Sequence, residues 1–167
     1  MILQIDDWKF DIDMERTIAY SANEAADHCD CAYCRNFYGA IDRSHPQLRP
    51  FLAQFGLDIE APDELMPFTA TNIAVYYAVS GRILQFGKSG IFCDRLTIYP
   101  ELPEVSLINT ECPRPIFIIH IGCFDLPWVL DEPLVEDEII SPANEPAFLK
   151  KMWQRLLGKA PKDSVNS

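Results

Sequence analysis

The sequence predicts an α+β fold with a mainly antiparallel sheet, two short helices after the first strand pair and a C-terminal helix. Three observations support this fold class. Period-two alternation begins near the N-terminus, helical spacing appears at three later points, and short turns separate the strands of the second half. The 167 residues suit a single domain, which we place at residues 1–158, with a loose C-terminal tail at 159–167.

The first elements expected are two neighbouring strands. Apolar side chains alternate with charged ones from Trp8 to Met14, which is the pattern of a half-buried strand. A second strand from Thr17 to Ser21 is expected to return beside it.

Two short helices are expected next. Asp30 can cap a helix over residues 31–42, whose apolar residues share one face. Ser44 opens a capping box with proline in the first turn, which predicts a second helix over residues 46–55, ended by Gly56. We expect both helices to pack on one face of the sheet.

The second half of the chain is expected to be mostly strand. Residues 57–70, rich in Pro, Asp and Glu, precede it as an irregular crossing, and Ser80-Gly81 reads as a tight hairpin turn. The run from Ile116 to Ile121 is apolar on both faces, which indicates a central strand covered on both sides. A last helix is expected over residues 144–158. The predicted strands span residues 73–79, 82–86, 95–99, 105–108 and 116–124.

Charge and composition restrict the partners. The formal net charge of −11 argues against nucleic-acid binding, which needs a positive surface. Residues 1–143 carry a net charge of −14 and residues 144–167 carry +3, which fits self-association, a basic protein partner or simply a well-solvated surface. No basic leader and no membrane-length apolar run is present, so we expect the cytoplasm, where structural disulfides are rare.

Reactive side chains concentrate in one segment, His28-Cys29-Asp30-Cys31-Ala32-Tyr33-Cys34, which holds three of the six cysteines. In an extended segment Cys29 and Cys31 point to the same face. If a helix begins near Ala32, Cys31 and Cys34 lie about one turn apart and are also neighbours. The three sulfurs can therefore converge on one point.

A metal site is the preferred interpretation, because three thiols within six residues exceed what packing requires. Zinc accepts Cys₃His or Cys₄ ligands, and we predict Cys29, Cys31, Cys34 and His28 as its ligands. His28 would point to the opposite face of an extended segment, and the sequence lacks the second ligand pair typical of zinc sites. The fourth ligand therefore stays open among His28, Cys93, Cys112, Cys123, His120 and His45.

Two other interpretations use the same residues. Cys31-Ala32-Tyr33-Cys34 is a Cys-x-x-Cys motif at a helix start, which suits thiol-disulfide exchange with Cys31 as nucleophile and Cys34 as resolving thiol. Such motifs normally occur in a βαβ context, whereas antiparallel hairpins are expected here. Alternatively, the cysteines are small apolar residues that fill a strand-to-helix junction.

The other polar candidates have structural explanations. His120 is interpreted as a satisfied core histidine, and His45 as a first-turn residue of a helix. Arg35 and Asn36 could hydrogen-bond back to the cysteine loop. The carboxylates of residues 131–138 lack the spacing of a calcium loop and are interpreted as solvated. No hydrolase, phosphate-loop, zinc-protease or dinucleotide motif is present, so the sequence does not indicate an enzyme.

Several short stretches carry a resemblance. Residues 29–37, the run Phe55-Gly56-Leu57-Asp58 and residues 126–130 together resemble a family of small uncharacterised bacterial proteins with a Cys-x-Cys-x-x-Cys-Arg-Asn signature. The resemblance covers most of the chain but is specific only in these stretches. It implies a bacterial, cytosolic, single-domain protein and transfers no substrate, cofactor or catalytic residue.

The function predicted from the sequence is a non-enzymatic module that binds metal, with zinc in a structural role, or another protein. One alternative is a thiol-disulfide redox protein that uses Cys31 and Cys34. A second alternative is an acidic binding partner such as a toxin-neutralising protein, which only charge and size support.

Overall fold

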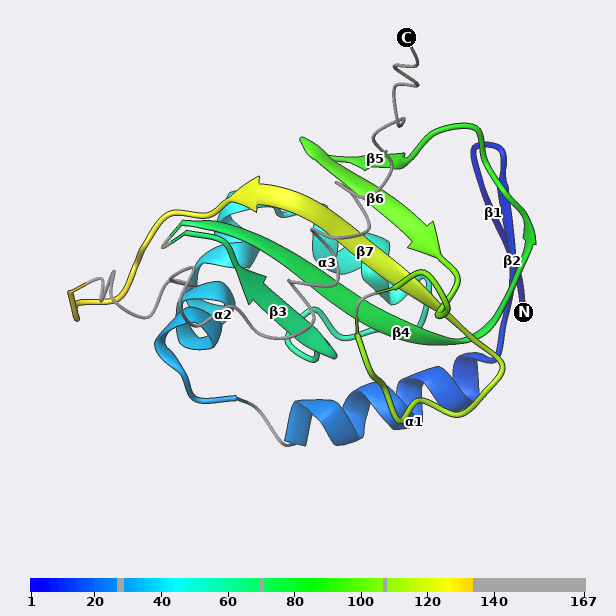
Figure 1. Cartoon of the computed structure of the whole chain (residues 1–167), viewed down its shortest axis with the longest axis horizontal. Coiled ribbons are helices and arrows are strands. Elements are labelled where there is room, and N and C mark those ends of the chain that lie inside the picture. The colour runs from blue at the N-terminus through cyan, green and yellow to red at the C-terminus, as the bar shows by residue number, and fades with distance from the viewer. Residues whose placement is uncertain (27–28, 70, 107, 134–167) are drawn as a thin grey trace, which may run out of the picture.

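A computed structural model describes residues 1–26, 29–69, 71–106 and 108–133. Within them it contains three helices and a seven-stranded antiparallel sheet, so the predicted mixture of helices and a mainly antiparallel sheet is confirmed (Figure 1). The helices are α1 (Met14–Ala26), α2 (Ala32–Ser44) and α3 (Leu48–Ala53). The strands are β1 (Ile2–Ile5), β2 (Trp8–Ile12), β3 (Glu64–Pro67), β4 (Asn72–Gln85), β5 (Ile91–Cys93), β6 (Leu96–Glu101) and β7 (Ile116–Asp125).

The long strand β4 organises the sheet. The strand order is β1-β2-β4-β7-β6-β5, and β3 also pairs with β4. The first part of β4 pairs with β3 and β7, and its last part pairs with β2. The predicted hairpin turn at Ser80-Gly81 is therefore wrong, because the strand continues through it. Gly81 is needed for another reason: a Cβ there would lie 2.3 Å from the backbone oxygen of Asp11, so glycine permits the close approach of β2.

Two apolar cores lie on opposite faces of the sheet. The larger core lies under α2 and α3, which cover one face as predicted (Figure 1). Alternate side chains of β7 supply both cores: Phe117 and Ile119 belong to the larger one, and Ile116 and Ile118 belong to the smaller one. Tyr20 of α1 packs against the smaller core. The prediction of a central strand that is apolar on both faces is confirmed.

The predicted strand from Thr17 to Ser21 is wrong, because this segment lies in α1. The alternation of the first strand ends at Ile12, and Asp13 then accepts hydrogen bonds from the backbone of the first helical turn. Thr17 and Ser21 lie four residues apart and are both buried. The Thr17 hydroxyl donates to the Asp13 carbonyl, 2.9 Å away, and accepts from the Ser80 backbone N–H. The predicted first strand, β2, pairs instead with β1, which precedes it, and with β4.

The remaining differences between the predicted and the observed strands concern short segments. Strands β1 and β5 were not predicted, and β3 lies inside residues 57–70, where an irregular crossing was expected. The strand predicted at residues 105–108 is wrong: residues 105, 106 and 108 have no strand structure. Runs of three or four residues carry too little alternation to stand out from a loop.

The helices α2 and α3 occupy the positions predicted at residues 31–42 and 46–55, but their caps differ. Cys31, not Asp30, is the N-cap of α2, and it makes no side-chain capping bond. Ser44 ends α2 instead of capping α3. The helix expected at residues 144–158 and the tail at 159–167 lie outside the described residues. In the described part of the chain, no helix is long and apolar enough to cross a membrane.

Candidate metal centre

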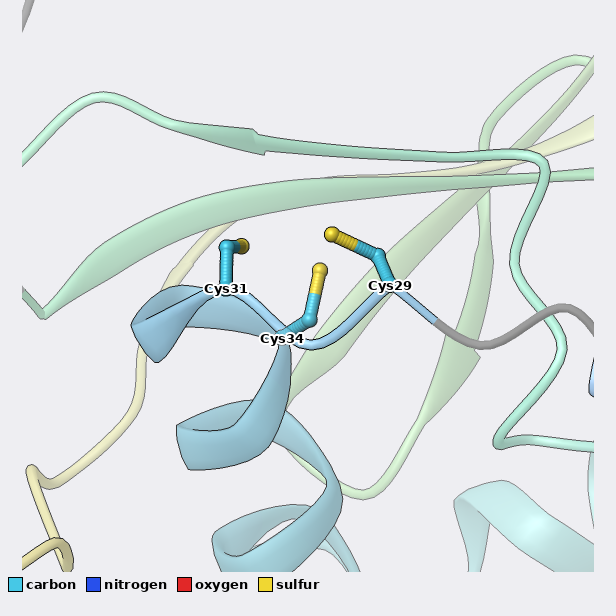
Figure 2. Close-up of side chains that lie close together, drawn as sticks. All are labelled: Cys29, Cys31 and Cys34. Carbon is cyan, nitrogen blue, oxygen red and sulfur yellow. The ribbon is translucent and has the colours of Figure 1, made fainter.

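Three cysteine sulfurs meet at the start of α2. The Sγ atoms of Cys29, Cys31 and Cys34 all lie within 4.8 Å of one another. Figure 2 shows the three side chains projecting to one side of the chain where it enters the helix. Cys29 comes before the helix, Cys31 is the N-cap, and Cys34 lies in the first turn. The convergence expected from their spacing is therefore present in the structure.

The local backbone brings the sulfurs together. Cys31 has extended dihedral angles (φ −71°, ψ 158°), and its carbonyl accepts the first helical hydrogen bond from the Arg35 N–H at 3.0 Å. The Arg35 side chain also donates to the Asp30 carbonyl at 2.6 Å, which confirms the predicted contact with the cysteine loop. Both bonds come from Arg35, and they fix the backbone at Asp30 and Cys31, within the bend between Cys29 and Cys34.

The three thiols differ in environment. Cys29 and Cys31 are exposed, whereas Cys34 is buried. Hydrogen bonds from the Cys31 backbone and from the thiols of Cys31 and Cys34 hold the pKa of Cys29 below its usual value. Burial raises the pKa of Cys34 well above its usual value, and hydrogen bonds with the other two thiols add to this effect. Cys29 is therefore the more readily ionised of these two thiols, and Cys34 stays protonated at neutral pH unless a cation binds.

The sulfurs face a pocket of about 380 Å³. The chain from Glu60 to Leu65, which leads into β3, forms the opposite wall. Burial raises the pKa of Tyr38 on α2 and of Glu64 on β3, both of which line the pocket. The described residues that line this pocket include no lysine or arginine, so their charged side chains are all acidic. The carboxylates come from Glu24, Glu60, Asp63 and Glu64.

The position of these carboxylates opposite the cysteines was not predicted from the sequence. Three of them belong to residues 57–70, and nothing in the spacing of that segment indicates that it lies opposite the cysteines. Their position follows from the pairing of β3 with β4. The pocket therefore combines soft sulfur donors on one wall with negative charge on the other, an arrangement that attracts cations.

The distant candidates for a fourth ligand do not join the three sulfurs. Among the described residues, no other cysteine, histidine or carboxylate lies within 4.8 Å of all three. Cys93 and Cys112 are buried in other parts of the molecule, and Cys123 is exposed near the end of β7. His28 lies outside the described residues, so its part in the site stays a prediction.

Both described histidines lie away from the cysteines. The Nδ1 atom of His120 lies 2.7 Å from Oε1 of Glu101, and its ring stacks on Tyr76 with centroids 4.4 Å apart. His120 is therefore satisfied, as expected, although it is only half-buried. His45 is buried at the end of α2, where it caps the helix rather than beginning one.

A second contact region joins α2 to the segment after β7. The Asn36 side chain donates to the Pro127 carbonyl at 3.2 Å and accepts from the Val129 N–H at 2.7 Å. Asn36 thus contacts this segment rather than the cysteine loop, where its contact was predicted. The Tyr33 ring meets the Trp128 ring edge-on, with centroids 6.1 Å apart. Two of the stretches that carry the resemblance are therefore in contact.

Known proteins add nothing to this geometry. Comparisons with protein-family models, with curated proteins and with solved structures found no match to the chain. The resemblance to bacterial proteins with the Cys-x-Cys-x-x-Cys-Arg-Asn signature stays a prediction.

Proposed function

We propose that this protein is a metal-binding module in which Cys29, Cys31 and Cys34 hold one zinc ion. The observation that carries the proposal is the mutual approach of three sulfurs within 4.8 Å. In a tetrahedral zinc site with Zn–S bonds of about 2.3 Å, neighbouring sulfurs lie about 3.8 Å apart. The upper limit of 4.8 Å on the sulfur separations lies within about 1 Å of that spacing.

The site suits a structural role. All three sulfurs come from one six-residue segment, so a bound ion would fix the bend that leads into α2. His28 is the predicted fourth ligand. Bound zinc would allow the buried Cys34 to ionise, because metal coordination displaces the thiol proton.

Elemental analysis tests the proposal. Protein purified under reducing conditions without chelator is expected to contain about one equivalent of zinc per chain. Cys31→Ser should lower the zinc content to less than about a tenth of an equivalent, because two thiolates retain zinc poorly. Cys123→Ser is the matched control, since Cys123 is also exposed but lies outside the cluster.

A cobalt titration distinguishes a protein that has lost its metal during purification from a protein that has no metal site. Cobalt bound by three thiolates gives an intense sulfur-to-metal charge-transfer band, which Cys31→Ser should weaken and Cys123→Ser should preserve. Purified protein with neither zinc nor a cobalt-thiolate band would rule out the metal-binding function.

The unequal thiols support a second candidate, thiol-disulfide exchange. The exposed Cys29 has a lowered pKa and the buried Cys34 a raised one, which is the asymmetry of an attacking and a resolving thiol. An exposed thiolate, Cys29 or the predicted Cys31, would attack a substrate disulfide and expel one thiolate. Cys34, after losing its proton, would then attack the mixed disulfide, leaving an internal disulfide and passing two electrons to the substrate.

Alkylation of zinc-free protein distinguishes the two candidates. If exchange is the function, one exposed cysteine should react with iodoacetamide near pH 6 much faster than the other thiols. In a separate sample that has not been alkylated, mild oxidation should form a disulfide to Cys34 that dithiothreitol reverses. Slow, uniform alkylation of all six cysteines would contradict the redox function without affecting the zinc proposal.

A further inference from the structure

A second, larger pocket lies where three elements end. Its volume is about 640 Å³, and its walls come from the end of α2, the turn between β5 and β6, and the end of β7. None of the residues that line the cysteine pocket takes part in it. Whatever this pocket binds is therefore independent of the proposed metal site.

Among the described residues that line it, the pocket has more positive than negative side chains. Arg43 and Arg95 both line it, and neither forms an ion pair within the described part of the chain. Asp125 is the only residue with a carboxylate among the described residues that line it, and its Oδ1 accepts a hydrogen bond from the Asn72 amide at 2.9 Å. A positive pocket is unexpected in a chain with a net charge of −11.

A specific contact joins the two segments that bear the arginines. Asp94 turns the chain between β5 and β6 with φ of 52°, a conformation that aspartate tolerates better than most residues. Its Oδ2 accepts a hydrogen bond from the Gln47 N–H at 3.0 Å. This bond ties the turn that bears Arg95 to the segment just after Arg43, so the geometry of the pocket is fixed by the fold.

The imidazole ring of His45 lies in the wall of the pocket. His45 is 6% exposed and lies edge-on to Phe124, with ring centroids 5.4 Å apart. Its Nδ1 atom is buried and has no hydrogen-bond partner among the described residues. Buried polar atoms are nearly always paired, and the exceptions call for an explanation such as a binding role. A polar ring in the same pocket lining as two arginines fits an anion-binding site better than a packing site.

We propose that this pocket binds a small organic anion whose carboxylate or phosphate group lies between Arg43 and Arg95. Guanidinium groups bind both kinds of oxyanion through paired, charge-assisted hydrogen bonds. The volume suits a metabolite-sized molecule rather than a macromolecule. The exposed Cys123 thiol also lines the pocket and provides a built-in reporter of binding.

Protection of Cys123 from alkylation tests the proposal. The rate of its reaction with iodoacetamide is measured by peptide mass spectrometry with added phosphate or succinate, at an ionic strength kept constant with NaCl. If the bound form does not react, about 5 mM of an anion with a dissociation constant of about 1 mM slows alkylation about sixfold. Alkylation of Cys29 in the same sample should not change.

Two variants decide whether the arginines are responsible. The double variant Arg43→Gln/Arg95→Gln should lose the protection. Arg82→Gln should keep it, because Arg82 is also exposed and without an ion pair in the described structure but lines neither this pocket nor the cysteine pocket. Protection by phosphate alone or succinate alone identifies the class of anion. Protection by neither anion, or protection that survives in the double variant, would overturn the proposal.

Discussion

Asn36 joins two parts of the chain that are far apart in the sequence. It is buried, and its side-chain amide bonds to both Pro127 and Val129. An asparagine side chain can satisfy a backbone donor and a backbone acceptor at once, which few other residues can do. This single residue therefore fixes the segment after β7 against α2.

Asn36→Ala is expected to lower the free energy of unfolding by about 1–3 kcal/mol, because it leaves the Pro127 carbonyl and the Val129 N–H without their partner. Denaturant unfolding measures the effect. Asn109→Ala is the control, since Asn109 is exposed and makes no hydrogen bond within the described structure, and its effect should stay within about 0.5 kcal/mol. Equal effects for the two variants would contradict the role given to Asn36.

His45 makes stability depend on pH. Burial lowers the pKa of His45, so below the unfolded-state pKa of about 6.5 the unfolded chain takes up a proton more readily than the folded one. The contribution of a neutral His45 is therefore complete above that pH and is lost as the pH falls. The loss of unfolding free energy between pH 7 and pH 5 should be smaller in His45→Phe than in the parent protein. An identical pH dependence in both would show that His45 does not titrate on unfolding.

The candidate site was only partly predictable at this scale. Local spacing was enough to bring Cys29, Cys31 and Cys34 together, because their geometry depends on a single bend and one helical turn. The acidic wall of the pocket and the contact of Asn36 with Pro127 depend on long-range pairing, which leaves no local pattern.

At the scale of the elements, the close approach of β2 and β4 requires glycine at position 81. Strand β4 passes β2 so closely at Gly81 that a side chain there would meet the backbone of Asp11. Backbone atoms cannot rotate away as a side-chain tip can. The pairing of β2 with β4 therefore depends on the absence of a side chain at this position.

Gly81→Ala is expected to destabilise the protein by more than about 2 kcal/mol, because β2 must move away from β4. Thermal unfolding followed by circular dichroism measures the change. Gly122→Ala is a matched strand control: its new Cβ would lie 3.2 Å from the side chain of the exposed Tyr99, which can shift. We expect it to cost less than about 1 kcal/mol. A Gly81→Ala variant as stable as Gly122→Ala would contradict this account.

The elements differ in how well the sequence predicts them. Helices α2 and α3 and strand β7 follow from periodicity, since each has a long apolar face or a continuous apolar run. Helix α1 was mistaken for a strand because the buried positions Thr17 and Ser21 are polar, so its buried face does not appear as an apolar stripe. The unbroken strand β4 was mistaken for a hairpin because the reason for Gly81 lies in β2.

At the scale of the whole molecule, the metal and the fold are expected to be loosely coupled. The larger core extends from β2 to the end of β7 and needs only Cys34 from the cysteine cluster. A core of this size folds without help from a metal, unlike that of a zinc finger. The bound ion would therefore add stability to a protein that is already folded.

Removal of zinc with a chelator should lower the melting temperature by roughly 5–10 °C without unfolding the protein, as expected for loss of about 3 kcal/mol of ligand stabilisation in a chain of this size. Far-ultraviolet circular dichroism should hardly change at 25 °C. Cys31→Ser, which lacks the site, should melt at the same temperature with and without the chelator. A chelator effect of equal size in that variant would point to a site elsewhere.

Strand β4 also determines how the protein unfolds. Its amides face β2 at one end and lie between β3 and β7 at the other, so neither half of the sheet can open without breaking bonds to the same strand. Opening one half of the sheet alone would therefore break many contacts and gain little conformational entropy. The two halves of the sheet should melt together in one cooperative step, and the amides of residues 73–80 should exchange with deuterium only when the whole chain unfolds.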